Sequence, residues 1–138
     1  MKNKTETLKQ LTPFAAILFS LMLSQLALSY GTRKKIVERD ENKSVESNKT
    51  NNLEAAHYNH NKKNGAYDTA DNGRLLTRAE HYMDHYKRHG QSDLGLSRQQ
   101  NKWALNTIWR RLTQKEKKGL PLPPRYEEDE EMQQTFNF

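Results

Sequence analysis

Apolar residues gather in one run near the start of the chain, from Phe14 to Leu28 (FAAILFSLMLSQLAL). A membrane-spanning helix needs about 20 apolar residues, whereas the apolar part of a signal peptide has about 7–15, which is the range of this run. Lysines precede the run, and Ala27-Leu28-Ser29, a small-x-small sequence of the kind that signal peptidases cleave, ends it. The pattern predicts a signal peptide over residues 1–29 and a secreted or extracytoplasmic protein. The alternative is an uncleaved anchor and a single-pass membrane protein.

Residues 30–73 show no lasting apolar period. Ile36, Val37, Val45 and Leu53 are their only aliphatic residues larger than alanine, and Asn, Lys, Glu, Ser and Thr fill most other positions. So few apolar side chains do not offset the conformational entropy that ordering costs, about 1–2 kcal/mol per residue. The pattern therefore predicts a disordered linker.

Apolar positions return at helical spacing after residue 74. Thr77 and Glu80 have the spacing of a capping box, which predicts a helix over Arg78–His89. Ser97 is a suitable N-cap for a second helix, predicted over Arg98–Lys118. The apolar stripe of this second helix consists of Leu105, Ile108, Trp109 and Leu112.

The short connection between these helices predicts a helical hairpin over residues 75–118, within a unit of residues 74–119. Its apolar side chains are few, so we expect it to need a protein partner, a membrane surface or self-association. Residues 120–138 begin with a Pro-rich stretch and continue with an acidic run at 127–131, which predicts a disordered tail. The predicted fold class is mostly disordered with a small all-α element.

Composition restricts the function classes. The chain has no cysteine, which excludes a catalytic thiol, a disulfide framework and a cysteine-based zinc site. The sequence shows no nucleophile–base pair, Gly-rich phosphate loop or pair of carboxylates on an ordered element. We therefore expect a binding protein, not an enzyme, and no cofactor. With a formal net charge of +6, an anionic surface or an acidic protein is the expected partner. For an exported chain we do not expect nucleic acid as the partner.

The second predicted helix is the candidate contact surface, because its polar face combines cations with a tryptophan. Trp103 lies opposite the apolar stripe on a helical wheel. The candidate partner-binding residues are Arg98, Lys102, Trp103, Trp109, Arg110, Arg111 and Lys117.

Histidines suggest a different chemistry. His81, His85 and His89 follow one another at intervals of four residues, which places them on one face of the first predicted helix. Two imidazoles one turn apart suit Zn²⁺ or Cu²⁺, and His57 or His60 would supply a third ligand. A metal site at His81, His85 and His89 is therefore an alternative to simple solvated histidines.

Two further patterns give alternative functions. Dibasic pairs such as Lys62-Lys63 and Arg110-Arg111 are typical of cleavage sites in a secreted peptide precursor. Pro123-Pro124-Arg125-Tyr126 resembles the Pro-Pro-x-Tyr ligand of WW domains. This resemblance implies a membrane-anchored adaptor with a cytosolic tail.

Overall fold

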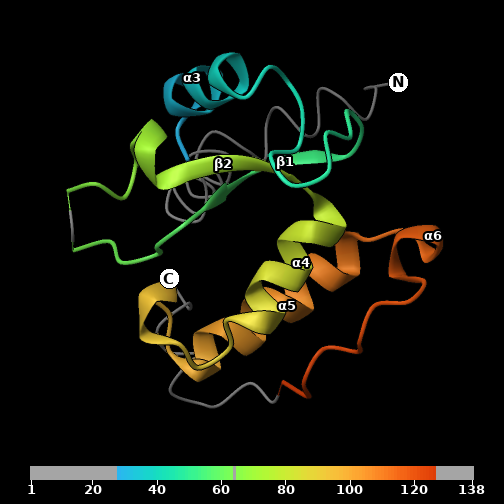
Figure 1. Ribbon diagram of the computed structural model, residues 1–138. Coiled ribbons are helices and arrows are strands. Elements are labelled where there is room, and N and C mark those ends of the chain that lie inside the picture. The colour runs from blue at the N-terminus through green and yellow to red at the C-terminus, as the bar shows by residue number, and fades with distance from the viewer. Residues whose placement is uncertain (1–27, 64, 127–138) are drawn as a thin grey trace, which may run out of the picture.

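A computed structural model describes residues 28–63 and 65–126. Within these residues the chain forms four α-helices and a short two-stranded sheet (Figure 1). The expectation of an all-α element is therefore wrong, because a sheet joins the helices. Most of the predicted signal segment and the whole acidic run at 127–131 lie outside the described residues.

The elements follow one another along the chain with short connections. Their bounds are α3 Tyr30–Arg39, β1 Leu53–His57, η1 Ala70–Asn72, β2 Gly73–Thr77, α4 Arg78–Lys87, η2 Ser92–Leu94, α5 Arg98–Arg111 and α6 Gln114–Lys117. β1 and β2 are antiparallel, with Ala55 opposite Leu75 and His57 opposite Gly73. The helix α3 covers one side of this sheet, and α4 and α5 lie on the other side (Figure 1).

The segment predicted as a disordered linker, residues 30–73, contains α3 and β1. Ile36 of α3 is fully buried and forms an apolar cluster with Leu28 and Leu75. A second apolar cluster lies between α4 and α5 and is built from Tyr82, Leu105, Ile108 and Leu112. The prediction of disorder was wrong here because the few apolar side chains of this segment pack together against one sheet. Such packing does not require a long periodic pattern in the sequence.

Polar contacts hold the connection between α3 and β1. The Asp40 carboxylate accepts a hydrogen bond from the Leu75 backbone N–H (3.0 Å), and the Val45 N–H donates to the Leu75 carbonyl (3.0 Å). The buried Ser44 hydroxyl donates to Glu80 (2.6 Å). Asn42, Asn48 and Asn52 have φ values of 54°, 60° and 53°, in the left-handed region that asparagine tolerates well. The asparagines of this segment thus serve as turn residues.

Replacing Ile36 with alanine is expected to destabilise the whole fold. The side chain is fully buried between α3 and the sheet, and truncating a buried isoleucine to alanine costs about 2–5 kcal/mol. Urea unfolding followed by circular dichroism measures the change. The control is Val45→Ala, which truncates a side chain that is 48% exposed and should change stability by about 0.5 kcal/mol or less. Equal effects of the two variants would contradict the packing of α3.

The predicted helix starts agree with the structure, and the predicted helix ends do not. Thr77 with Glu80 and Ser97 with Gln100 form complete capping boxes at the starts of α4 and α5. The helix α4 ends at Lys87, and α5 ends at Arg111 instead of continuing to Lys118. The reason is a further capping box, in which Thr113 and Glu116 start the short helix α6.

The Pro-rich segment after α6 is extended and runs along the helix pair. The Tyr82 hydroxyl donates to the Pro121 carbonyl (2.8 Å), and the Asn106 amide donates to the Pro124 carbonyl (2.9 Å). Leu120 packs against the cluster between α4 and α5. The helix pair thus obtains apolar and polar contacts from a segment predicted to belong to the tail.

None of the helices in the described part of the chain has both the length and the apolar composition needed to cross a bilayer.

Candidate functional site

Four of the five histidines lie together in the structure. The ring centroids of His57 and His60 are 4.9 Å apart, those of His60 and His85 are 5.0 Å apart, and those of His81 and His85 are 4.9 Å apart. We call these four residues the histidine cluster. They form a continuous row of imidazoles, although the chain places them in two pairs that lie more than 20 residues apart.

Two elements and one loop position the cluster. His57 is the last residue of β1, and His60 follows in the loop, where its backbone N–H donates to the Leu94 carbonyl (2.9 Å). His81 and His85 lie one turn apart on α4, so their side chains share a face. Because α4 begins directly after β2, and Thr77 at the end of β2 lies opposite Leu53 at the start of β1, the first turn of α4 lies beside the start of β1.

Asn101 of α5 determines the tautomer of His85. Its amide nitrogen donates to the His85 backbone carbonyl (2.9 Å), since a carbonyl oxygen can only accept. The other atom, Oδ1, is therefore an acceptor, and it lies 2.7 Å from Nδ1 of His85. Nδ1 of His85 must carry the proton, which leaves a lone pair on Nε2 of the neutral ring.

Glu54 of β1 orients His81 in the same way. Its Oε2 atom lies 2.7 Å from Nδ1 of His81. Burial alone would raise the pKa of Glu54, but the hydrogen bond from His81 and the charges of His81 and Arg111 outweigh it and lower that pKa. The carboxylate is thus ionised, and Nδ1 of His81 is the donor. Nε2 of His81 then faces His85.

The two oriented rings present their Nε2 atoms to each other at 3.2 Å. Two lone pairs at this distance repel, so the contact requires a proton or another cation between the two nitrogens. The Nε2 atoms of His57 and His60 are buried and have no hydrogen-bond partner among the described residues. The cluster therefore holds four Nε2 atoms, two of which converge and two of which have no hydrogen-bond partner among the described residues.

No set of three His, Asp or Glu side chains in the described residues already surrounds one point as a bound metal ion requires. The arrangement supplies two converging nitrogens, from His81 and His85. A further ligand from His60 or His57 requires rotation of its side chain.

Burial keeps three of these histidines uncharged at neutral pH. It lowers the pKa of His57 and of His85 to about 4, and that of His60 to about 2. The positive charges of neighbouring histidines act in the same direction, as does Arg88 for His60 and His85. Neutral imidazole is the form that binds metal ions.

These pKa values predict that acid destabilises the metal-free chain. The unfolded chain takes up protons near pH 6.5, whereas the folded chain keeps His57 and His85 neutral down to about pH 4. The free energy of unfolding should therefore have its full value above about pH 6.5 and decrease as the pH drops towards 4. Urea unfolding at several pH values with a chelator present measures this, and a His60→Gln variant should show a weaker pH dependence. A flat profile across this range would contradict the burial of the cluster.

Cations and an aromatic ring surround the histidine cluster. Tyr67 stacks on His57 with a centroid distance of 4.3 Å, and the Lys62 ammonium lies 5.8 Å from the Tyr67 ring. Arg111 pairs with Glu54 (3.1 Å). Arg88 donates to the Tyr58 carbonyl at the start of the loop (2.6 Å). Arg88 also pairs with Asp84 (3.2 Å) and Asp93 (3.6 Å), so carboxylates balance the arginines beside the cluster.

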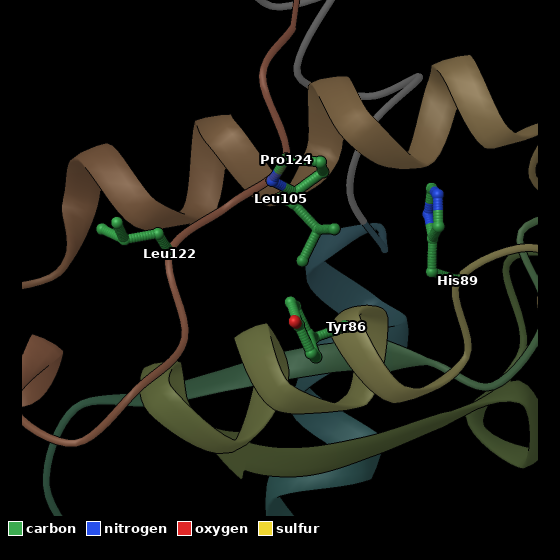
Figure 2. A pocket seen from close by; sticks show the side chains of 5 residues that line it. All are labelled: Tyr86, His89, Leu105, Leu122 and Pro124. Carbon is green, nitrogen blue, oxygen red and sulfur yellow. The ribbon is translucent and has the colours of Figure 1, made fainter.

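His89 does not join the cluster. It lines a shallow cavity of about 320 Å³ on the other side of Asn101, together with Tyr86, Leu105, Leu122 and Pro124. Figure 2 shows Tyr86 of α4 and Leu105 of α5 pointing toward each other, with Pro124 of the C-terminal segment close to Leu105. Since the Asn101 amide donates to Nδ1 of His89 (2.9 Å), one buried asparagine joins the histidine cluster to this cavity.

No protein-family model matches this chain, no curated protein is significantly similar to it, and no solved structure matches it.

The structure brings together two of the three predicted metal-binding residues, His81 and His85, and separates His89 from them. In place of His89 it supplies His57 and His60, which sequence reasoning considered only as accessory ligands. Glu54 and Asn101 were missed. Asn101 could have been found from one feature of the sequence. It lies four residues before Leu105 and therefore on the apolar stripe of α5, where a buried polar side chain needs a hydrogen-bond partner.

The predicted partner-binding residues do not form one uniform face. Arg98, Arg110 and Arg111 are exposed, and Lys102, Trp103 and Lys117 are half-buried. Trp109 packs against Tyr82 with a centroid distance of 5.3 Å, and the Lys117 ammonium lies 5.2 Å from the Trp109 ring. The exposed arginines are therefore the part of this surface that is open to solvent.

Proposed function

We propose that the chain binds one transition-metal ion in its histidine cluster. The observation that carries this proposal is the pair of Nε2 atoms of His81 and His85, 3.2 Å apart, with both Nδ1 atoms held by Glu54 and Asn101. Histidine ligands of metals characteristically donate their second ring nitrogen to a carboxylate or a carbonyl in this way. A metal ion bound to the two Nε2 atoms would take the place of the proton that otherwise joins them.

The spacing of the two nitrogens suits a tetrahedral ion. Zn–N bonds of about 2.0–2.1 Å at a tetrahedral angle place two ligand nitrogens roughly 3.3 Å apart, close to the 3.2 Å between His81 and His85. His60, whose ring lies beside that of His85, is the proposed third ligand, and His57 is the proposed fourth. All-imidazole ligation suits Zn²⁺, Cu²⁺ or Ni²⁺ better than Mg²⁺ or Ca²⁺.

The number of histidine ligands decides what the ion does. Four imidazoles complete a tetrahedral site, which would make the ion a structural element that joins β1 and the following loop to α4. Three imidazoles leave one position for water, and a bound Zn²⁺ lowers the pKa of that water to about 7. His60 lies in a loop and is the ligand whose presence or absence separates these two cases.

Isothermal titration of the intact chain with Zn²⁺ tests the proposal. We expect one equivalent of Zn²⁺ to bind, and binding to be lost in a His85→Ala variant. The matched control is His89→Ala, which removes a histidine from the same helix end but not from the cluster and should leave the stoichiometry unchanged. Binding that survives in His85→Ala and disappears in His89→Ala would refute the cluster as the site.

Glu54→Gln is expected to weaken Zn²⁺ binding by about 10–100-fold without abolishing it, which is the usual effect of removing a residue that orients a histidine ligand. The substitution keeps the size of the side chain and removes the charge that orients His81. Competition with a chromophoric chelator measures the affinity. Glu116→Gln is the control, because Glu116 pairs with Arg78 (2.8 Å) and touches no histidine. A similar loss in both variants would mean that the effect of Glu54 is not specific to His81.

We also propose that the metal-bound chain contacts a polyanionic partner. The exposure of Arg98 and Arg110 favours this second function, as does the exposed Lys62 beside the cluster. Binding to acidic vesicles and to nucleic acid should weaken steeply as salt rises, because counterion release or screening removes the attraction. An Arg98→Gln/Arg110→Gln variant should bind at least about 10-fold more weakly than the natural chain, whereas Lys43→Gln, a charge change at an exposed position between α3 and β1, should not. Salt-independent binding would contradict this proposal.

The same incubations distinguish a structural ion from a catalytic one. Cleavage of the nucleic acid that requires Zn²⁺ and is lost in His85→Ala would mean that the site keeps a water ligand. An intact nucleic acid would mean that the site does not act on this substrate.

A further inference from the structure

We infer that Leu28 and Ser29 belong to the mature protein, so that any processing of the N-terminus ends on the N-terminal side of Leu28. The sequence alone favours cleavage after Ser29, because Ala27 and Ser29 are both small. The contacts that these two residues make in the folded chain are incompatible with their removal.

Leu28 is part of the core. Its side chain is 2% exposed and packs against Ile36 and Leu75, in the cluster that joins α3 to the sheet. Gly73 of β2 leaves the space that this packing occupies, since a Cβ atom at residue 73 would lie 2.9 Å from Cδ1 of Leu28 and 2.5 Å from Cδ1 of Ile36. Without Leu28 the cluster would lose one of its three buried members and open beside Gly73.

Ser29 starts the helix α3 and attaches it to the rest of the fold. Its hydroxyl accepts from the Thr32 N–H (3.4 Å), and its carbonyl accepts from the Arg33 N–H (2.9 Å). Its backbone N–H donates to the Asp68 carboxylate (3.0 Å), across 39 residues of chain. This hydrogen bond is the largest cause of the lowered pKa of Asp68. Ser29 thus acts as an N-cap and as a link to the segment before η1.

A cut after Ser29 would also introduce an unfavourable charge. Tyr30 is the first residue of α3, and the new α-ammonium group would lie at the positive end of the helix dipole, where a cation is destabilising. The cut would remove a core side chain, an N-cap and a hydrogen bond, and would add this repulsion. A cut before Leu28, or no cut, avoids all four effects.

Intact-mass analysis and N-terminal sequencing of the chain from the cells that produce it test the inference. The expected N-terminus lies at Leu28 or at an earlier residue. An N-terminus at Ser29, Tyr30 or a later residue would overturn the inference.

A processing variant gives an independent test. Ser29→Leu removes the small residue that cleavage after Ser29 requires, and we expect the ratio of precursor to product to stay the same. Accumulation of precursor would overturn the inference. In addition, a chain that starts at Tyr30 should unfold at a temperature lower by at least about 10 °C than a chain that starts at Leu28. Equal unfolding temperatures would show that the contacts of Leu28 and Ser29 do not matter.

Discussion

Zn²⁺ at about 100 times its dissociation constant is expected to raise the free energy of unfolding of the chain by about 2.7 kcal/mol. The reason is that the ligands come together only in the folded chain. His57 and His60 belong to β1 and its following loop, and His81 and His85 belong to α4, so an unfolded chain offers no comparable site. Urea unfolding with Zn²⁺ and with a chelator measures the difference.

Variants assign this stabilisation to the histidine cluster. In His81→Ala/His85→Ala, Zn²⁺ should no longer raise the free energy of unfolding, whereas in His89→Ala the full increase should remain. The metal-free stability of each variant is measured first, so that a loss of folding is not mistaken for a loss of binding. A full Zn²⁺ effect in the double variant would show that the ion binds elsewhere.

Gly95→Ala is expected to destabilise the fold and to weaken metal binding together. Gly95 has a φ of +74°, and its added Cβ would lie 2.6 Å from the backbone nitrogen of Asn61 and 3.0 Å from that of His60. These are backbone atoms, so the loop that carries His60 must move. We expect a cost of about 1–2 kcal/mol for the left-handed conformation and a further 1–3 kcal/mol for the collision.

Gly119→Ala is the matched control for this variant. Gly119 also has a positive φ, +83°, but no heavy atom lies within 4 Å of its added Cβ. It should show only the conformational cost of about 1–2 kcal/mol and no change in Zn²⁺ affinity. If both variants lose the same stability and bind Zn²⁺ equally, the loop after β1 is not held against Gly95.

The helices whose starts are marked by local sequence were predictable. Thr77 with Glu80 and Ser97 with Gln100 satisfy orphan backbone groups within four residues of chain, so the sequence contains the whole signal. The end of α5 was not predictable from its apolar stripe. The stripe continues to Leu112, but the capping box of Thr113 and Glu116 starts a new helix there.

The sheet and α3 were missed because they depend on distant contacts. The strand β1 has the sequence LEAAH, whose two alanines have little intrinsic preference for a strand, and it pairs with β2 in a two-stranded sheet. The helix α3 is mostly polar, and it is stabilised by Ile36 and by the contacts of Ser29 and Asp40 with residues more than 30 positions away. Amphipathic periodicity does not report such contacts.

The candidate site was predictable only where its sequence signal is local. The interval between His81 and His85 is a local helical signal, and the structure places these two rings together. The sequence contains the same interval between His85 and His89, but α4 ends at Lys87, and Asn101 holds His89 away from the other rings. His57 and His60 approach only because β1 pairs with β2 and β2 leads directly into α4.

The most direct test of the metal site is an NMR experiment that correlates the imidazole nitrogens with their ring protons, recorded with and without one equivalent of Zn²⁺. The account predicts that Nε2 of His81 and of His85 shifts to the position of a metal-bound nitrogen, while both Nδ1 atoms remain protonated and bonded to Glu54 and Asn101. It also predicts that the imidazole nitrogen signals of His60 shift on addition of Zn²⁺ and that neither ring nitrogen of His89 binds the ion. Unchanged Nε2 signals of His81 and His85 at saturating Zn²⁺ would contradict the proposed site.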